Sequence, residues 1–204
     1  KPCVRKLFEP VLDEIFILAD NGTDIWSSQY QTSMKLPYEL YTELIDDIHE
    51  LEGYSIMACK PDIAYFEYGH EKYFEHMRGI KDICKISVWR EEGIDPAVER
   101  RMQEKWSDVM EVCMAGECFL DFMAKGCNKG KALSIMQGHY GIGREDTVAF
   151  GNADNDIPML QNAAHSYAVA AASTRLKETA SQVIGEMKDD AVLKKLREIL
   201  NIAG

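Results

Sequence analysis

Residues 147–160 read TVAFGNADNDIPML, and this stretch decides the fold. The apolar run at 147–150 predicts a buried strand, and residues 157–164 predict the start of a helix. The loop between them carries two Asn and two Asp side chains. Because open α/β sheets bind ligands beyond the carboxyl ends of their strands, this loop is the first candidate for a functional site.

Strand and helix patterns alternate on both sides of this loop. Upstream, residues 119–124 (FLDFMA) predict a strand, and residues 129–140 predict a helix whose apolar side chains share one face. Downstream, residues 167–170 (YAVA) predict another strand, and helices are predicted around 175–183 and from Asp190 onward. This β-α-β-α-β order predicts a parallel sheet covered by helices.

The N-terminal residues are predicted to belong to the same domain, which is interrupted by an insertion. Residues 15–19 (IFILA) predict a strand that ends in the turn sequence Asp20-Asn21-Gly22, and residues 23–26 can return as a second strand. The pattern then changes to helices at 36–51, 70–77 and 95–106 and strands at 54–59, 62–68, 83–89 and 110–114. The sequence therefore predicts an α/β core of residues 1–32 and 117–204, interrupted by an α+β domain of residues 33–116.

Composition limits the partners and the location. The 204 residues carry a formal net charge of −11, so we expect neither nucleic acid nor an anionic membrane as a partner. The six cysteines form no C-x-x-C pair and lie mostly in apolar segments, which is typical of reduced, buried thiols. No leader sequence and no run of about 18 apolar residues is present, so a cytoplasmic location is expected. The sequence carries no signature of an oligomeric state.

Two loops carry groups that suit phosphate chemistry. The Asp side chains of the 151–156 loop can bind Mg²⁺, and Lys129 and Asn155 can donate hydrogen bonds to a phosphoryl oxygen. A lysine beside a carboxylate-bound cation is what phosphoryl transfer needs, because catalysis there is mostly positioning and charge neutralisation. The spacing is also compatible with a simple turn, in which Asp156 caps the following helix and Lys129 is solvated. Spacing alone leaves both interpretations open.

A resemblance to a known family favours the first interpretation. The segments NKGKAL (128–133), VAFGNADNDIPML (148–160) and YAVA resemble the C-terminal half of haloacid dehalogenase-like (HAD) phosphatases of the Cof type, which have a class IIB cap. Those proteins show K-G-x-A-L followed by F-G-D-x-x-N-D-x-x-M-L. LADNGTDIW (18–26) is similar to the strand and Asn-Gly turn that precede the family's cap. The resemblance covers essentially the whole chain and implies a Rossmann-like HAD core with a parallel sheet, interrupted by an α+β cap domain.

The resemblance also implies roles for individual residues. Lys129 would contact the phosphoryl group and the nucleophilic carboxylate, and Asn155 would be a second phosphate ligand. Asn152 occupies the position of the acidic Mg²⁺ ligand, and Asp156 would support the metal shell or orient Lys129. The Asn21-Gly22 turn would lie at the edge of the active site, where cap and core meet.

Two departures from the family pattern change these expectations. Asn152 stands where the family has an Asp, and a neutral amide oxygen binds Mg²⁺ more weakly than a carboxylate, unless Asp154 or Asp156 compensates.

The second departure concerns the nucleophile. The family's D-x-D-G-T motif is absent, since the D-x-D at 154–156 belongs to the other loop and Asp20 has no second Asp two residues later. We therefore expect that roughly forty residues, one β-α unit with its loops, precede this sequence in the enzyme. The 204 residues alone are expected to be inactive.

Three functions follow as hypotheses. The leading one is Mg²⁺-dependent hydrolysis of phosphate monoesters of small metabolites, such as sugar phosphates or nucleotide and cofactor phosphates, through an aspartyl-phosphate intermediate. The alternative is a non-catalytic HAD-like protein that binds a phosphorylated ligand or has a regulatory role. In that case Asn152 and the absent nucleophile motif would reflect the loss of catalytic activity. The third is a phosphomutase, which would transfer the phosphoryl group to a second hydroxyl instead of to water.

Overall fold

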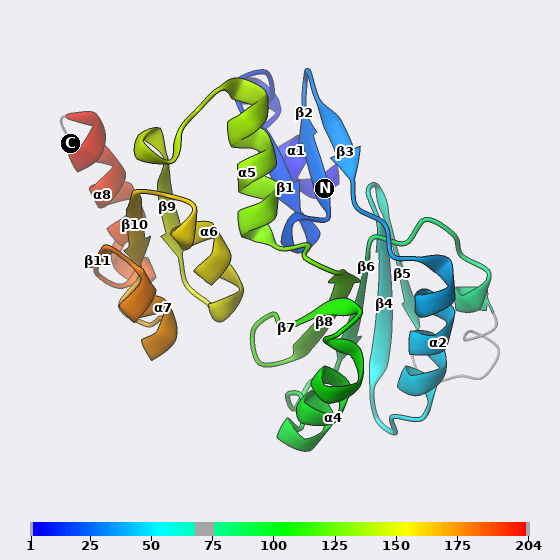
Figure 1. Cartoon of the computed structure of the whole chain (residues 1–204). Helices are drawn as coiled ribbons and strands as arrows, with labels where there is room; N and C mark the ends of the chain where they lie inside the picture. Colours follow the sequence, from blue (N-terminus) through cyan, green and yellow to red (C-terminus); the bar gives the residue numbers. More distant parts are fainter. Residues whose placement is uncertain (1, 68–75, 203–204) are drawn as a thin grey trace. The chain divides into compact units, whose positions relative to one another are not determined.

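The computed structural model describes residues 2–67 and 76–202, which Figure 1 traces from the N-terminus to the C-terminus. The chain divides into two compact units, Lys1–Asn128 and Lys129–Gly204, which we call unit 1 and unit 2. Three sheets are present in the described part of the chain, two in unit 1 and one in unit 2.

The smaller sheet of unit 1 is antiparallel, with strand order β1-β2-β3. It follows helix α1 (Pro2–Leu7) and the short 3₁₀ turn η1 (Glu9–Val11). Its strands are β1 (Phe16–Ala19), β2 (Asp24–Ser27) and β3 (Gln31–Ser33). The connection between β1 and β2 is η2 (Asp20–Gly22), where all three residues have positive φ, at 50°, 56° and 94°. The predicted strand, Asn-Gly turn and returning strand are thus confirmed.

The larger sheet of unit 1 has the order β5-β4-β6-β8-β7, and all its neighbouring strands are antiparallel. The strands are β4 (Ser55–Lys60), β5 (Ile63–Glu67), β6 (Lys85–Trp89), β7 (Met110–Met114) and β8 (Phe119–Ala124). Helices α2 (Tyr38–His49) and α4 (Pro96–Trp106) agree with the predicted ones. The predicted helix at 70–77 falls mostly outside the described residues.

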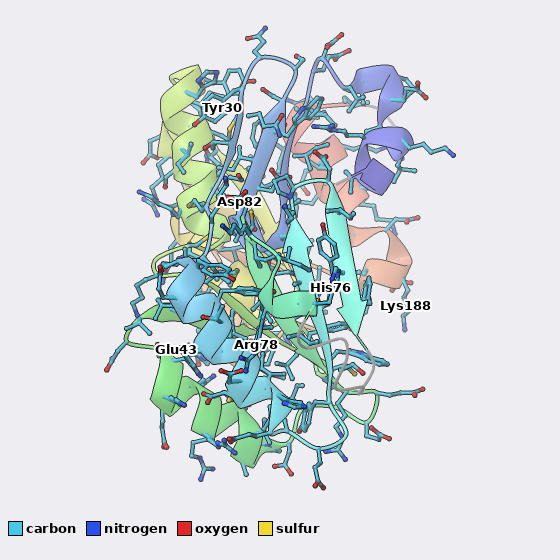
Figure 2. The ribbon with its side chains drawn as sticks, turned by 90° about the vertical axis from the view of Figure 1, so that its right-hand side faces the viewer. Tyr30, Glu43, His76, Arg78, Asp82 and Lys188 are labelled. Atoms are coloured by element: carbon cyan, nitrogen blue, oxygen red, sulfur yellow. The ribbon has the colours of Figure 1, made fainter. Side chains whose placement is uncertain are left out.

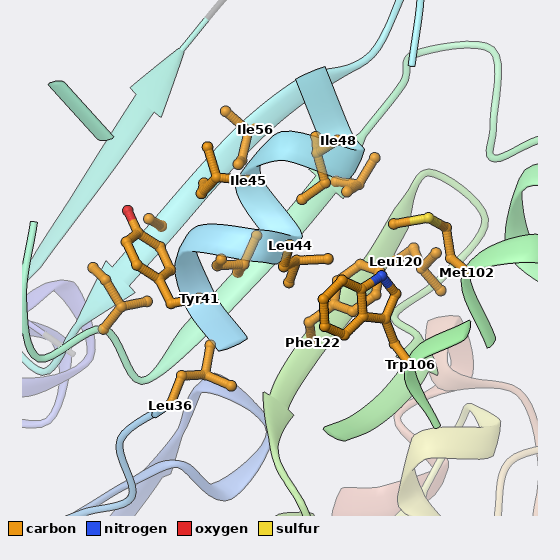
Figure 3. Packing of buried hydrophobic residues seen from close by; sticks show 14 of the residues in the cluster. Leu36, Tyr41, Leu44, Ile45, Ile48, Ile56, Met102, Trp106, Leu120 and Phe122 are labelled. Atoms are coloured by element: carbon orange, nitrogen blue, oxygen red, sulfur yellow. The ribbon is translucent and has the colours of Figure 1, made fainter. Parts of the chain in front are cut away.

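Helix α2 forms because its apolar residues recur every three or four positions. Tyr41, Leu44, Ile45 and Ile48 are all at most 2% exposed and face the sheet and α4 in one core, together with Phe122, Leu120, Trp106 and Met102 (Figure 3). The opposite face of α2 is charged: Glu43 is exposed, and Asp46 forms an ion pair with the exposed Arg78 (Figure 2 labels Glu43 and Arg78).

Strand β8 corrects one prediction. Residues 119–124 were expected to begin the parallel sheet, but β8 pairs antiparallel with β6 and β7. The physical reason is that β7 and β8 form a hairpin. Only four residues separate them, among them Gly116 with φ 79°. Parallel neighbours would need a far longer connection. Leu120 and Phe122 then face the core of unit 1. The boundaries between core and insert, at residues 32/33 and 116/117, stay a prediction. In the structure, β8 follows the second boundary but lies in the same sheet as the strands of the insert.

Unit 2 has the predicted alternation of strands and helices. Its parallel sheet has the order β11-β10-β9, formed by β9 (Val148–Gly151), β10 (His165–Ala168) and β11 (Gln182–Val183). The helical elements are α5 (Lys129–Tyr140), η3 (Arg144–Asp146), η4 (Asp154–Asp156), α6 (Ile157–Gln161), α7 (Thr174–Thr179), η5 (Met187–Asp189) and α8 (Ala191–Leu200). The helix expected to reach residue 183 is therefore wrong in its second half, because α7 ends at Thr179 and the chain joins the sheet as β11.

Two other expectations concern the whole chain. Cys59, Cys84 and Cys127 are buried, as predicted, whereas Cys113 and Cys118 are only partly buried, and none of these five described cysteines forms a disulfide. Within residues 2–67 and 76–202, no helix combines the length and the apolar character needed to cross a membrane.

Candidate active site

The candidate site of unit 2 is built around an ion pair between Lys129 and Asp156. Lys129 is the first residue of α5, and Asp156 is the last residue of η4, just after β9. Lys129 Nζ lies 2.5 Å from Asp156 Oδ1, and the exposed fractions of the two side chains are 29% and 4%. The lysine can therefore reach solvent or a ligand, while the carboxylate behind it fixes its position.

Asp156 also organises the loop that precedes it. Its second oxygen, Oδ2, accepts hydrogen bonds from the backbone N–H groups of Asn152 at 2.8 Å and Ala153 at 3.1 Å. The side chain makes no capping bond to α6, so the interpretation of Asp156 as a simple helix cap is wrong. A carboxylate with an ammonium and two N–H donors is well satisfied in this buried position.

Two glycines permit this close packing. A Cβ atom on Gly151 would lie 2.8 Å from Asp156 Cβ, and one on Gly130 would lie 2.3 Å from the carbonyl oxygen of Pro158 in α6. Distances this short exclude any larger residue unless the backbone shifts. Gly130 thus allows α5 to approach α6, and Gly151 allows Asp156 to fold back over the end of β9.

The other predicted residues of this loop have different environments. Asn152 is exposed, and Asn155 is partly buried. The carboxylate of Asp154 accepts hydrogen bonds from the Ser173 hydroxyl and from Arg175 Nη1, the latter at 3.1 Å. The structure therefore brings Lys129, Asp156 and the backbone of Asn152 together, and turns Asp154 toward the next loop.

The donor set of the loop fits Mg²⁺ in part. Asn152 is an exposed residue with a hard oxygen ligand, whereas the carboxylates of Asp154 and Asp156 already bind neighbouring groups. Mg²⁺ usually keeps several waters and needs only one or two protein oxygens besides a substrate phosphate. Among residues 2–67 and 76–202, no group of three or more His, Cys, Asp or Glu side chains could hold a metal ion. The loop can thus contribute ligands to a magnesium site without enclosing one.

Asn21 and Gly22 lie in unit 1, where they adjoin a buried cluster of polar side chains. Asn21 Nδ2 donates to Asp121 Oδ2 at 2.6 Å, and Ser87 Oγ donates to Asp121 Oδ1 at 2.5 Å. Lys85 Nζ lies 3.2 Å from Asp121 Oδ2 and 3.4 Å from Asp20 Oδ1. The cluster fixes the β1–β2 turn to the centre of the five-stranded sheet.

Electrostatics keep Lys85 in its charged form. Burial favours the neutral amine of Lys85, but the carboxylates of Asp121 and Asp20 outweigh it, so the pKa of Lys85 is raised. Asp121 is 1% exposed and Ser87 is fully buried. Sequence reasoning missed Lys85, Ser87 and Asp121, although a lysine and an aspartate inside apolar strands (KISVW, FLDFMA) were a usable signal.

The chain matches known proteins over most of its length. A family model described as haloacid dehalogenase-like hydrolase matches residues 3–196. The Escherichia coli protein 5-amino-6-(5-phospho-D-ribitylamino)uracil phosphatase YbjI is 23% identical over 209 residues, which cover 95% of this chain and 77% of that protein. An HMP-PP phosphatase of Serratia proteamaculans is 33% identical over 93 residues, 45% of this chain and 34% of its own length.

A solved structure has the same fold. The HAD subclass IIB sugar phosphatase BT4131 superimposes with a TM-score of 0.81 at 19% identity, over 98% of this chain and 80% of that one. Together with the parallel sheet of unit 2, this similarity confirms the predicted α/β fold class.

Proposed function

Because the chain belongs to the haloacid dehalogenase-like hydrolases, we propose that it acts in the hydrolysis of phosphate monoesters of small metabolites. The observation that carries this proposal is the Lys129–Asp156 pair, which presents a partly exposed ammonium beside the loop at the carboxyl end of β9. A fixed cation at such an edge is suited to bind a phosphoryl group.

The substrate class follows from chemistry shared by the relatives. Their names describe phosphatases of a phosphoribitylaminouracil, of HMP-PP and of sugars, all of them small phosphorylated molecules. For this chain we propose a small phosphorylated metabolite, either a sugar phosphate or a nucleotide or cofactor phosphate. Lys129 and Asn155 would donate hydrogen bonds to its phosphoryl oxygens. Contact of the substrate with Asn21 and Gly22 stays a prediction.

The proposed reaction has two steps. An Asp carboxylate attacks phosphorus, the ester P–O bond breaks, and the leaving oxygen takes a proton from a general acid that later regains it from the attacking water. Water then attacks the aspartyl phosphate, which releases inorganic phosphate and restores the carboxylate. In this proposal the attacking Asp lies outside these 204 residues, because they contain no D-x-D-G-T sequence. Lys129, held by Asp156, offsets the negative charge that develops on the phosphoryl oxygens.

We further propose Mg²⁺ as the cofactor, with Asn152 as an oxygen ligand and Asp156 supporting the metal shell from behind the loop. When bound, the cation would neutralise phosphoryl charge and orient the group for in-line attack. Asp156 would serve mainly to orient Lys129, since both of its oxygens already accept hydrogen bonds.

The experiment is a phosphate-release assay with the full-length protein on a panel of sugar, nucleotide and cofactor phosphates, with and without Mg²⁺. We expect metal-dependent release of inorganic phosphate from at least one substrate. Phosphate transfer to a second sugar hydroxyl, without release, would instead identify a phosphomutase. Binding of inorganic phosphate without turnover of any substrate would support the non-catalytic alternative, which the Asn at position 152 favours.

A further inference from the structure

Asp154 connects the loop after β9 to the loop after β10. Its Oδ1 accepts a hydrogen bond from the Ser173 hydroxyl, and its Oδ2 lies 3.1 Å from Arg175 Nη1. Ser173 is also the N-cap of α7, because its hydroxyl oxygen accepts from the backbone N–H of Leu176 at 3.2 Å. One hydroxyl therefore links the carboxylate of Asp154 to the first turn of α7.

The register of the sheet explains why these loops meet. Strands β9 and β10 are parallel neighbours, and Ala168 lies opposite Gly151. Each strand ends at that pair, so both connections leave the sheet at the same edge. The β9 loop is thus held on one side by Asp156, through the backbone of Asn152, and on the other side by Asp154.

We infer that Asp154 is a positioning residue of the phosphate loop: through Ser173 it holds the loop in place, and it does not replace the missing acidic ligand at position 152. This inference rests on the proposed phosphatase function. Both oxygens of Asp154 already accept hydrogen bonds, one from Ser173 in the β10 loop and one from Arg175 in α7, and the side chain is 40% exposed. In this inference, Asn152 and the buried Asp156 are the residues of the loop that serve the metal site, and Asp154 is not part of that site.

The two partners of Asp154 differ in how strongly they bind its carboxylate. The Arg175 side chain is 76% exposed, so water screens its ion pair with Asp154 and the pair contributes little. The hydroxyl of Ser173 donates to a charged acceptor, which makes a stronger bond than one between neutral groups. Ser173 should therefore matter more than Arg175 for the position of the loop.

The test is a double-mutant cycle on the full-length protein with Asp154→Ala and Ser173→Gly. Glycine removes the hydroxyl and remains an acceptable N-cap, so the cycle separates the link to Asp154 from the stability of α7. One readout is hydrogen exchange at the amides of Asn152 and Ala153, without metal or substrate. The second is kcat/KM and the Mg²⁺ concentration that gives half-maximal activity.

We expect each single variant to speed exchange at these two amides and to lower kcat/KM by about 5-fold, the effect of one net hydrogen bond. The double variant should be no worse than either single variant, because both remove the same link. The Mg²⁺ requirement should change equally in the two variants. Thr179→Ala is the matched control, since it removes another hydroxyl bond of α7, to the carbonyl of Arg175, and should leave all readouts unchanged.

Two results would overturn the inference. A strongly increased Mg²⁺ requirement in Asp154→Ala alone, with Ser173→Gly unchanged, would make Asp154 a metal ligand. Additive effects of the two substitutions on amide exchange would show that they are not coupled. If the wild-type protein hydrolyses none of the phosphates tested, the proposed function fails, but the exchange measurement still decides whether Asp154 and Ser173 hold the loop.

Discussion

Replacing Lys85 by methionine removes a cation from the buried cluster of unit 1 and leaves the buried carboxylate of Asp121 without its cationic partner. Removing one partner of a buried ion pair typically costs about 3–5 kcal/mol. Asp121 keeps two of its donors, Ser87 and Asn21, so we expect a loss near the lower end, about 3 kcal/mol, in the free energy of unfolding. The similar length of methionine keeps the packing of the side-chain stem.

Urea unfolding followed by tryptophan fluorescence measures this loss. All three tryptophans of the chain (Trp26, Trp89 and Trp106) lie in unit 1, so the signal reports the unit that contains the cluster. Adding Asp121→Asn to Lys85→Met should restore part of the stability, because it removes the stranded charge.

The matched control is Lys35→Met, which breaks an exposed ion pair with Asp82 in the same unit and should change stability little. If the Lys85→Met protein is as stable as the Lys35→Met protein, the reasoning that burial makes the Lys85 ion pairs important for stability is refuted.

Three further predictions concern packing, pH and capping. Gly130→Ala should destabilise the protein by about 1–3 kcal/mol, because its Cβ would overlap the backbone of α6. Gly138 lies in the same helix with open space around it, so Gly138→Ala should stabilise the protein. Thermal unfolding of the two variants measures the difference. Burial raises the pKa of the Cys59 thiol from 9.0 to about 12, so its contribution to stability is complete below pH 9 and is lost as the pH rises toward 12. The stability difference between wild type and Cys59→Ala should therefore shift by about 1.4 kcal/mol per pH unit above pH 9, and pH-independence would contradict this. Asp95→Ala should cost about 1 kcal/mol in urea unfolding, because the Asp95 side chain accepts from the backbone of α4, and Asp95→Asn should retain most of that stability.

Local sequence signals predicted several of the helices and strands. The helix at 129–140 and the strand at 110–114 agree with the structure residue for residue, and Asp95-Pro96 marked the start of α4 correctly. These segments have apolar spacing or capping residues that specify one local conformation without help from distant contacts.

Pairing between strands depends on distant contacts, and there the sequence was less informative. The apolar run at 119–124 could join either sheet, and the short connection from β7 decided the pairing. Strand β11 has two residues, too few for periodicity. It pairs with β10, and just before it Ser181 is hydrogen-bonded to Ser166 of β10. Such long-range partners are not visible in a single sequence.

The candidate site was predictable in part for the same reason. Lys129 and Asp156 belong to motif segments, and the structure joins them directly. The backbone bonds of Asp156 depend on Gly151 leaving room for its side chain, and the buried contacts of Asp121 depend on the register Ser87↔Asp121. Geometry of this kind follows from tertiary packing and not from spacing along the chain.

The central claim is that Lys129 neutralises a phosphoryl group in a phosphatase site. The most direct test is kcat/KM of the full-length protein and its Lys129→Ala variant on the best substrate with Mg²⁺, with Lys194→Ala, an exposed lysine of unit 2, as the control. The account predicts a loss of about 10²–10³-fold in kcat/KM for Lys129→Ala, measured at a temperature at which the variant is folded, and no loss for the control. Equal turnover by the Lys129→Ala variant and the wild type would contradict it.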